Sequence, residues 1–303
     1  MGPMRTDRPV SPLAGRAYAK MNGIGNEILV LDLRSTPASA SAEEVRLLAG
    51  APGLAFDQLM AVHDPRGEGA EAFVRIYNAD GSDAGACGNG SRCVAWYLMR
   101  GTGKDDLRLE TVSGPIDCVR LGPWRFMVDM GRPRFAWSEI PVAAPLSDTG
   151  SADLGLGEAE RFLGKASLVN MGNPHAIFWV DHLKGLDVAG LGARLERHPL
   201  FPERANISFA RVRNRRSIEL AVWERGAGQT RACGSAACAV VVAAARANLC
   251  EREAEVDLPG GRLSIHWRED DHVTMTGPCE LESEGRLPAE LFQQAGDHED
   301  QHA

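Results

Sequence analysis

Short apolar segments of two kinds recur along the chain. In one kind hydrophobic and polar residues alternate, which is the pattern of a strand with one buried face. Such segments are ILVLD (28–32), RFMVDM (125–130), SIELAVW (217–223), RLSIHW (262–267) and HVTMT (272–276). The other kind is apolar on every side, as in CVAWYLM (93–99) and CAVVVAAARA (238–247). A helix of that composition has to be enclosed by other elements. We expect these two helices to end near Gly101 and Asn248.

The pattern repeats with a nearly constant offset. Ala-Cys-Gly occurs with its cysteine at 87 and again at 233, each time before one of the two apolar helices. Gly-Asn precedes Ala-Cys-Gly in each half, in MNGIGNEILVLD (21–32) and VNMGNPHAIFWVD (169–181), at nearly the same offset. Phe56 and Phe201 form a weaker third pair. Repeated motifs in the same order indicate two halves of similar fold.

These observations predict an α/β (α+β) fold of two pseudo-symmetric domains. Each domain would be a curved, mostly antiparallel sheet wrapped around one central helix. We place the halves at 16–133 and 134–277, with GRPRFAWSEIP (131–141) as the crossing between them and the active site at their interface. Residues 1–15, which include three prolines and no long apolar run, are expected to be a disordered tail rather than a signal peptide.

Composition narrows the class of partner. The 303 residues carry 33 basic and 41 acidic side chains, a net charge of -8, with no run rich in lysine or arginine, so a small molecule is a better candidate ligand than nucleic acid. The longest apolar run, 236–245, is too short for a bilayer. Seven cysteines without a C-x-x-C pair favour reduced thiols in the cytoplasm over disulfides or a metal site, so we predict no metal ligands. The four lysines give no sign of pyridoxal phosphate, and no cofactor is predicted.

Cys87 and Cys233 are the candidate catalytic residues. A cysteine at a helix start is expected to have its pKa pulled below its free value, and the following glycines leave backbone N–H groups free to hold a carboxylate. Two such sites facing one cleft suit inversion at a carbon next to a carboxylate, because one group removes a proton from one face and the other delivers a proton to the opposite face. The remaining cysteines are expected to be ordinary buried residues: Cys93, Cys118, Cys238, Cys250 and Cys279.

Other polar residues cluster near these motifs. His175, in MGNPH, could tune or relay a thiol proton. Glu224 and Arg225, in WERGAGQTRACG, could bind the ammonium and carboxylate of an amino acid. Each of five amide side chains could equally form a turn or contact a ligand: Asn26, Gln58, Asn78, Asn173 and Asn206.

Taken together, these motifs resemble the diaminopimelate epimerase family. The matching stretches are KMNGIGNEILVLD, FDQLM, RIYNADGSDAGACGNGSRC, VNMGNPHAIFWV, FPERANISF and WERGAGQTRACGSAACA, between Lys20 and Ala239. The resemblance implies epimerisation of LL- to meso-diaminopimelate without pyridoxal phosphate, in the pathway to lysine and peptidoglycan. It also implies a dimer, and a last strand (within about 278–303) that returns to the first domain.

The resemblance assigns a role to each motif residue. Cys87 and Cys233 would be the acid/base thiols, assisted by His175 and Glu224. Backbone groups would hold the reacting carboxylate at Gly88, Asn89, Gly234 and Ser235. The distal carboxylate would be bound by Asn78, Asn173, Asn206 and Arg225, and the distal ammonium by Glu224. Asn26 and Gln58 would line the reacting end. Two positions depart from the family pattern: Glu27 replaces an aspartate, and Ala236 replaces a glycine.

Three alternatives remain open. Another racemase or isomerase of the same fold would share the paired cysteines, but proline racemases place a histidine where this chain has Asn89. A Cys-His hydrolase would leave the second Ala-Cys-Gly without a purpose. A binding module without catalysis would bind ligand and exchange no hydrogen.

Overall fold

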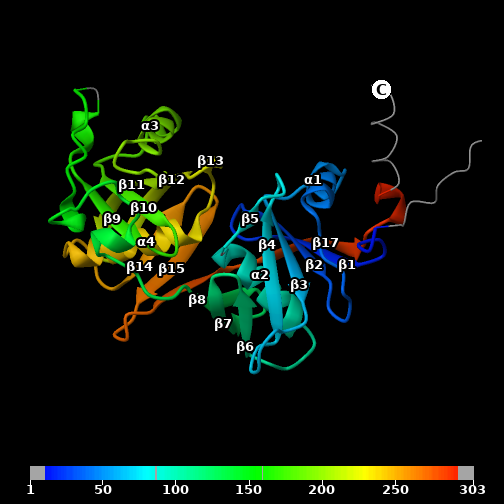
Figure 1. Cartoon of the computed structure of the whole chain (residues 1–303). Helices are drawn as coiled ribbons and strands as arrows, with labels where there is room; N and C mark the ends of the chain where they lie inside the picture. The colour runs from blue at the N-terminus through cyan, green and yellow to red at the C-terminus, as the bar shows by residue number, and fades with distance from the viewer. Residues whose placement is uncertain (1–10, 86, 159, 293–303) are drawn as a thin grey trace, which may run out of the picture.

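The structure is a computed structural model that describes residues 11–292 except 86 and 159. Two lobes lie side by side (Figure 1). The N-terminal lobe contains β1 (Ala17–Asn22), β2 (Glu27–Asp32), α1 (Ala42–Gly50), β3 (Gln58–His63), β4 (Ala72–Asn78), β5 (Asp83–Ala84), α2 (Gly88–Met99), β6 (Asp106–Thr111), β7 (Gly114–Gly122), β8 (Arg125–Asp129) and β17 (Glu280–Arg286). The C-terminal lobe contains β9 (Ala166–Asn170), β10 (Pro174–Trp179), α3 (Val188–Leu195), β11 (Asn206–Asn214), β12 (Ser217–Glu224), β13 (Gly228–Thr230), α4 (Gly234–Arg246), β14 (Glu253–Leu258), β15 (Gly261–Trp267) and β16 (Val273–Pro278). Short 3₁₀ turns lie at Trp137–Glu139, Thr149–Ser151, Arg161–Leu163 and Ala289–Phe292.

The strand pairing of one lobe repeats in the other. In the first lobe β2 pairs parallel with β3 and β4 parallel with β6, and the other neighbours are antiparallel. In the second lobe β10 pairs parallel with β11 and β12 parallel with β14, again among antiparallel neighbours. The helices α2 and α4 occupy equivalent places in this order. The predicted fold class, mostly antiparallel sheets around central helices, is confirmed.

Two strand pairs tie the lobes into one network. β8 pairs antiparallel with β16, so the end of the first repeat joins the end of the second. β17 then continues along β1 in the N-terminal lobe, and Figure 1 shows it crossing from the orange strands to the blue ones. The chain between β8 and β9, which begins with Gly131–Pro141, forms the connection between the repeats.

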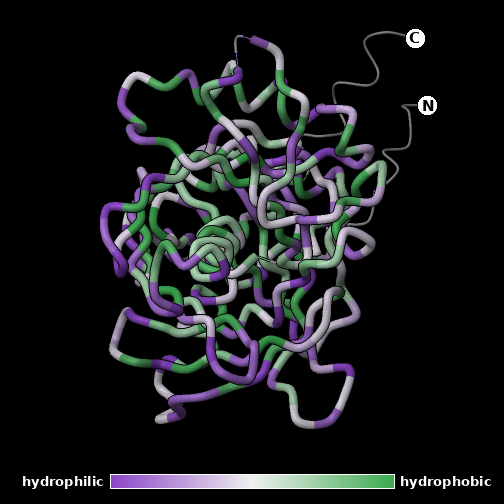
Figure 2. The backbone as a smooth tube through the Cα atoms, turned by 90° about the vertical axis from the view of Figure 1, so that its left-hand side faces the viewer, coloured by the Kyte–Doolittle hydropathy of each residue, from purple (hydrophilic) through white to green (hydrophobic). Residues whose placement is uncertain are grey.

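The two central helices are buried because their sequences leave no polar face. In α4 the buried residues include the run Ala236–Ala244, which packs against the inner side of the C-terminal sheet. In α2 Cys93, Val94 and Ala95 are fully buried in the corresponding core. Figure 2, which views the C-terminal lobe from outside, shows the hydrophobic tube of α4 near the middle, with more hydrophilic loops around it. Both helices end near the predicted residues, at caps Arg100 and Ala247.

The outer faces of the sheets carry separate cores. Phe56 follows α1 and Phe201 follows α3, and both are buried in these outer cores. The weak repeat signal between these phenylalanines therefore marks equivalent positions.

The prediction of a disordered tail is wrong for residues 11–15. Leu13 is fully buried in the outer core of the N-terminal lobe, and the Gly15 N–H donates to the Leu287 carbonyl at 2.8 Å. Apolar contact with the returning C-terminal segment holds this turn. Residues 1–10 of the predicted tail, and 293–303 of the predicted returning segment, lie outside the described residues.

Gly192 offers a test of packing in α3. A Cβ at this position would lie 2.4 Å from Cβ and 2.5 Å from Cγ of Trp223. We expect Gly192→Ala to destabilise the protein by about 1–3 kcal/mol, because the displaced ring outweighs the better helix propensity of alanine. Gly50, in α1, has open space around it, so Gly50→Ala should be neutral or stabilising by up to about 1 kcal/mol. Urea unfolding midpoints measure both; equal midpoints for the two variants would contradict this packing.

Candidate active site

The two candidate cysteines are the N-caps of the central helices. Cys87 caps α2 and Cys233 caps α4, both in extended backbone conformation. Neither helix has an acidic residue in its first turn. By contrast, α1 neutralises its own start with a capping box made by Ser41 and Glu44. The starts of α2 and α4 thus keep their positive potential and N–H groups available for an anion.

Met275 of β16 brings the two helix starts together. A Cβ on Gly88 would lie 2.4 Å from Met275 Cε, and a Cβ on Gly234 would lie 2.8 Å from Met275 Sδ. Asn89 Oδ1 lies 3.5 Å from the same position on Gly234. A Cβ at either glycine would displace the end of this methionine, so with glycine at both positions the first residues of α2 and α4 approach the same side chain.

A turn from the N-terminal lobe closes over the same region. Ile24 and Gly25 have φ values of 59° and 89°. A Cβ on Gly25 would lie 3.1 Å from Cα of Gly260 and 3.3 Å from Cβ of Arg231, both in the C-terminal lobe. Cys87 is only 9% and Cys233 only 4% exposed. The site is in a closed arrangement.

Cys87 is surrounded by hydrogen-bond donors. Its Sγ accepts the Gly90 N–H at 3.1 Å, and Asn26 Nδ2 donates to it at 3.9 Å. Glu224, across the lobe boundary, is near enough for its charge to act on the thiol.

Cys233 has a different environment. Its Sγ lies 3.5 Å from Ser235 Oγ, and the thiol also interacts with the Glu224 carboxyl group. Thr230 Oγ1 donates to Glu224 Oε1 at 2.5 Å, which fixes that carboxyl group beside the sulfur. The charge of Glu224 therefore acts on both cysteines.

The expectation of lowered thiol pKa values is wrong for the closed site. Burial raises the pKa of Cys87 to about 11, against the Gly90 hydrogen bond that lowers it. Burial, together with the nearby Glu224 charge, raises the pKa of Cys233 well above its usual value. Loss of water outweighs the helix start because a thiolate loses more solvation than one backbone N–H returns.

His175 is a neutral imidazole. Burial lowers its pKa to about 3, and the charge of Arg225 adds to the effect. Its Nε2 lies 2.8 Å from Asn173 Oδ1, so this nitrogen carries the proton and donates. The other nitrogen, Nδ1, is buried without a partner and can accept a hydrogen bond from a ligand.

The remaining predicted residues form two groups. In the C-terminal lobe, Asn173 Nδ2 donates to Ser235 Oγ at 3.3 Å, and Asn206 Oδ1 accepts the Arg225 N–H at 2.9 Å. His175 lies opposite Asn206 in the β10–β11 register and so joins these pairs. In the N-terminal lobe, Gln58 Nε2 donates to Asn78 Oδ1 at 3.1 Å. This second group has a weaker link to the cysteines, through the charge of Asp57 acting on Glu224.

Several atoms of the site are buried without a hydrogen-bond partner. Among the described residues, four of these atoms belong to the segments that meet here: Asn26 Oδ1, Asn89 Oδ1, Arg92 Nη2 and His175 Nδ1. Unsatisfied buried polar atoms are costly, and a polar ligand would supply partners for them.

Sequence reasoning missed four supporting residues. Glu196 accepts the Trp223 Nε1–H at 2.7 Å and the Gly226 N–H at 3.0 Å, and so fixes the loop that carries Glu224 and Arg225. Thr230 holds the Glu224 carboxyl group, and Met275 lies beside Gly88 and Gly234. Arg92 donates to the sulfur of Met275. An acidic residue in the helix before the FPERANISF motif was the only sequence signal for Glu196, and it is indistinguishable there from a surface residue.

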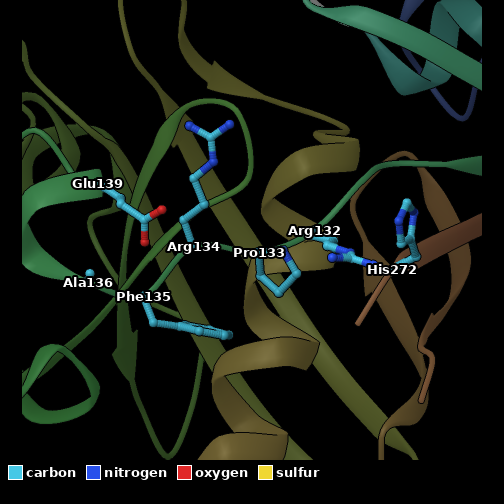
Figure 3. Close-up of a pocket in the computed structure, with 7 residues that line it drawn as sticks. All are labelled: Arg132, Pro133, Arg134, Phe135, Ala136, Glu139 and His272. Carbon is cyan, nitrogen blue, oxygen red and sulfur yellow. The ribbon is translucent and has the colours of Figure 1, made fainter. Parts of the chain in front are cut away.

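A surface hollow lies away from the two cysteines. It lies on the connection after β8, lined by Arg132, Pro133, Arg134, Phe135, Ala136, Glu139 and His272 (Figure 3). Asp129 holds the His272 ring at 2.9 Å. None of the predicted site residues lines this hollow, as expected when the lobes are closed over the cysteines.

Within 11–292, less 86 and 159, no three histidine, cysteine or acidic side chains are grouped as a metal ion would need. In the same part of the chain, every helix is too short or too polar to cross a membrane.

Comparison with known proteins agrees with the geometry. The family model described as diaminopimelate epimerase matches residues 18–136 and 167–282. A diaminopimelate epimerase of Methylocella silvestris is 53% identical over 94% of this chain and 99% of its own length. One from Rhodopseudomonas palustris is 52% identical over 93% of this chain and 97% of its own.

Solved structures share the fold at low sequence identity. A predicted epimerase of Pseudomonas aeruginosa has a TM-score of 0.64 and 19% identity, covering 90% of this chain and 99% of its own. A hydroxyproline epimerase of Agrobacterium vitis has a TM-score of 0.62 and 14% identity, covering 90% of each chain.

The buried imidazole predicts a pH dependence of stability. Because the folded-state pKa of His175 lies below its ordinary value, its contribution is complete above about pH 6.5 and is lost as pH falls toward 3. We expect the unfolding free energy of the wild type, relative to His175→Gln, to fall by about 1.4 kcal/mol per pH unit below 6.5. Exposed His182 provides the control, since His182→Gln should run parallel to the wild type. Parallel curves for wild type and His175→Gln down to pH 4 would refute a buried neutral imidazole.

Proposed function

The chain belongs to the diaminopimelate epimerase family, and we propose that Cys87 and Cys233 are the acid and base with which it converts LL-2,6-diaminopimelate to the meso form. The observation that carries this proposal is the pair of cysteine-capped helix starts that meet at Met275. Each lobe contributes one sulfur, so the two can reach one carbon from opposite faces.

The proton transfers balance within the pair. The thiolate of one cysteine takes the α-proton and becomes a thiol, and the C–H electron pair passes into the substrate carboxylate. The thiol of the other cysteine then protonates the opposite face and becomes the thiolate. A further proton exchange with solvent or a reverse turnover restores the starting state, so the reaction needs no cofactor.

Stabilisation of the carbanion falls to the helix starts. The N–H groups of Gly88, Asn89, Gly234 and Ser235 would bind the reacting carboxylate as its charge grows. The absence of acidic residues from the first turns of α2 and α4 supports this role.

Neighbouring side chains would manage the protons and the ammonium group. Glu224 contacts Cys233 and acts electrostatically on Cys87, so it can favour the thiol form of whichever sulfur it faces. It would also bind the distal ammonium. His175 would accept a hydrogen bond at Nδ1, because its low pKa keeps that nitrogen unprotonated.

The distal carboxylate would lie among Asn78, Asn173, Asn206 and Arg225. The Asn206–Arg225 hydrogen bond supports a joint role for those two residues. Asn26 would line the reacting end, next to the Cys87 sulfur that it already contacts, and Gln58 would lie beside it.

The wider organisation is also a proposal. Segments 16–133 with 278–303, and 134–277, would be two domains that open to admit substrate and close on it, in a cytoplasmic homodimer. Pairing of β17 with β1 supports the first grouping. The acidic net charge supports the absence of a nucleic-acid partner.

Solvent deuterium tests the reaction and the cysteines together. In D₂O with LL-diaminopimelate, we expect deuterium at one α-carbon of the meso product, because the delivered proton comes from a thiol that exchanges with solvent. Cys87→Ala and Cys233→Ala should each lower the epimerisation rate by about a thousandfold, the middle of the range for removal of a general acid or base. NMR of the product and circular dichroism of the reaction follow both effects.

Cys118, buried in β7, is the matched control. Cys118→Ala should keep the rate within about threefold of wild type, since its thiol lies outside the two helix starts. Product without deuterium would disprove the two-base reaction, whereas a single-cysteine variant at full rate would disprove the assignment of the pair.

A further inference from the structure

Within the part of the chain that the structure describes, Arg92 is a buried cation without an anionic partner. It lies in the second turn of α2, five residues after Cys87, and its side chain is completely buried. Among the ion pairs of the described residues, none includes Arg92. A guanidinium keeps its proton in proteins, so this is a permanent charge in the interior.

The hydrogen bonds of Arg92 do not balance that charge. Nε donates to the Pro278 carbonyl at 3.2 Å, and Nη1 to Met275 Sδ at 3.6 Å. Nη2 has no partner, and it lies 3.5 Å from the position of a Cβ on Gly23. Leaving a buried charge unpaired ordinarily costs several kcal/mol, so its retention needs a cause.

The ionisable groups near Arg92 are thiols. The side chains whose charges act on it are those of Cys93, Cys279, Cys87 and Cys238. Of these four, only Cys87 lies at the junction of the lobes and caps a helix start. Burial lowers the pKa of Arg92 and raises that of Cys87, while each group's charge favours the ionised form of the other.

We propose that Arg92 is a positioning residue whose fixed charge stabilises the thiolate of Cys87, and whose contact with Met275 holds that side chain between Gly88 and Gly234. This inference rests on the proposed acid/base role of Cys87. When the Cys87 proton leaves, for the carbanion or for solvent, the negative sulfur becomes the anion that Arg92 otherwise lacks. Arg92 itself neither gains nor loses a proton.

Charges from several elements act on Cys87, and they oppose one another. Arg92 of α2 stabilises the thiolate together with the N–H of Gly90, and Asn26 donates from the turn after β1. Glu224 of β12 destabilises the thiolate. Without Arg92, the charge of Glu224 would act against the Cys87 thiolate, and only hydrogen-bond donors such as the Gly90 N–H would stabilise that thiolate.

Two substitutions separate the charge of Arg92 from its packing. Arg92→Gln keeps a hydrogen-bond donor and loses the charge, whereas Arg92→Lys keeps the charge and loses the planar donor set. Cys279→Ala is the matched control, because it loosens the same buried cluster without changing the charge. Melting temperatures establish which of the variants are folded.

The first readout is the acid limb of the pH profile of kcat/KM for LL-diaminopimelate. We expect Arg92→Gln to move this limb upward by about one pH unit, the lower range for loss of an opposite charge. Its rate below the limb would be about tenfold lower, and it should approach the wild-type rate at higher pH. Arg92→Lys and Cys279→Ala should leave the limb in place even where they lower the melting temperature.

The second readout does not require turnover. Alkylation of Cys87 by iodoacetamide, followed across pH by peptide mass spectrometry, should show the same upward shift in Arg92→Gln. A wild-type protein that fails to epimerise would disprove the proposed function and leave this readout intact. Two results would overturn the role of Arg92: a loss of kcat/KM in Arg92→Gln that does not depend on pH, or an equal shift of the acid limb in Cys279→Ala. If Arg92→Gln does not fold, Arg92→Lys replaces it, and an acid limb displaced in Arg92→Lys would also overturn the role.

Discussion

The close approach of two helix starts is the constraint on which the site depends. Gly88 and Gly234 both give up a side chain so that one methionine can occupy the space beside them. A methyl group at either position would displace the flexible end of that methionine. The proposed carboxylate site is arranged around this contact, because the N–H groups of both helices must point at one ligand to hold a single carboxylate. The pairing of β8 with β16 fixes the backbone of Met275, because this residue lies on β16 opposite Val128 of β8.

Closure of this site creates an electrostatic cost. The same burial that encloses both sulfurs also raises their pKa values. A resting closed enzyme without ligand would therefore hold two thiols and no base. In the proposed reaction, substrate would change this balance, because its ammonium groups add positive charge. Entry of substrate and formation of the thiolate would then be coupled, and the proposed opening of the lobes would give the sulfur access to water in which it can ionise.

The repeated motifs predicted the fold well because the repeat acts at the level of topology. Two Ala-Cys-Gly motifs 146 residues apart became the caps of equivalent helices, and the strand segments at 28–32 and 262–267 became β2 and β15. The strength of the desolvation at Cys87 was not predictable, because it depends on how residues far apart in the sequence enclose the thiol. For the same reason the roles of Met275 and Glu196 were hidden, since each is defined by partners far away in sequence. Leu13 was missed because a single apolar residue in a proline-rich stretch gives no periodic signal.

The two halves share one fold, but different polar groups surround their cysteines. The proposed reaction gives a reason for this difference. Strict symmetry would make the two thiols equally acidic, and a proton would then have no preferred position between them. Here Cys87 accepts a backbone N–H from its own helix, whereas Cys233 lies beside Ser235 and the Glu224 carboxyl group. At any step a two-base epimerisation needs one thiolate and one thiol. In the proposed reaction, a difference built into the protein would decide which sulfur ionises once substrate is bound, and a small difference would still allow the reverse state that the return reaction requires. Divergence of the polar residues within a duplicated backbone would meet both demands.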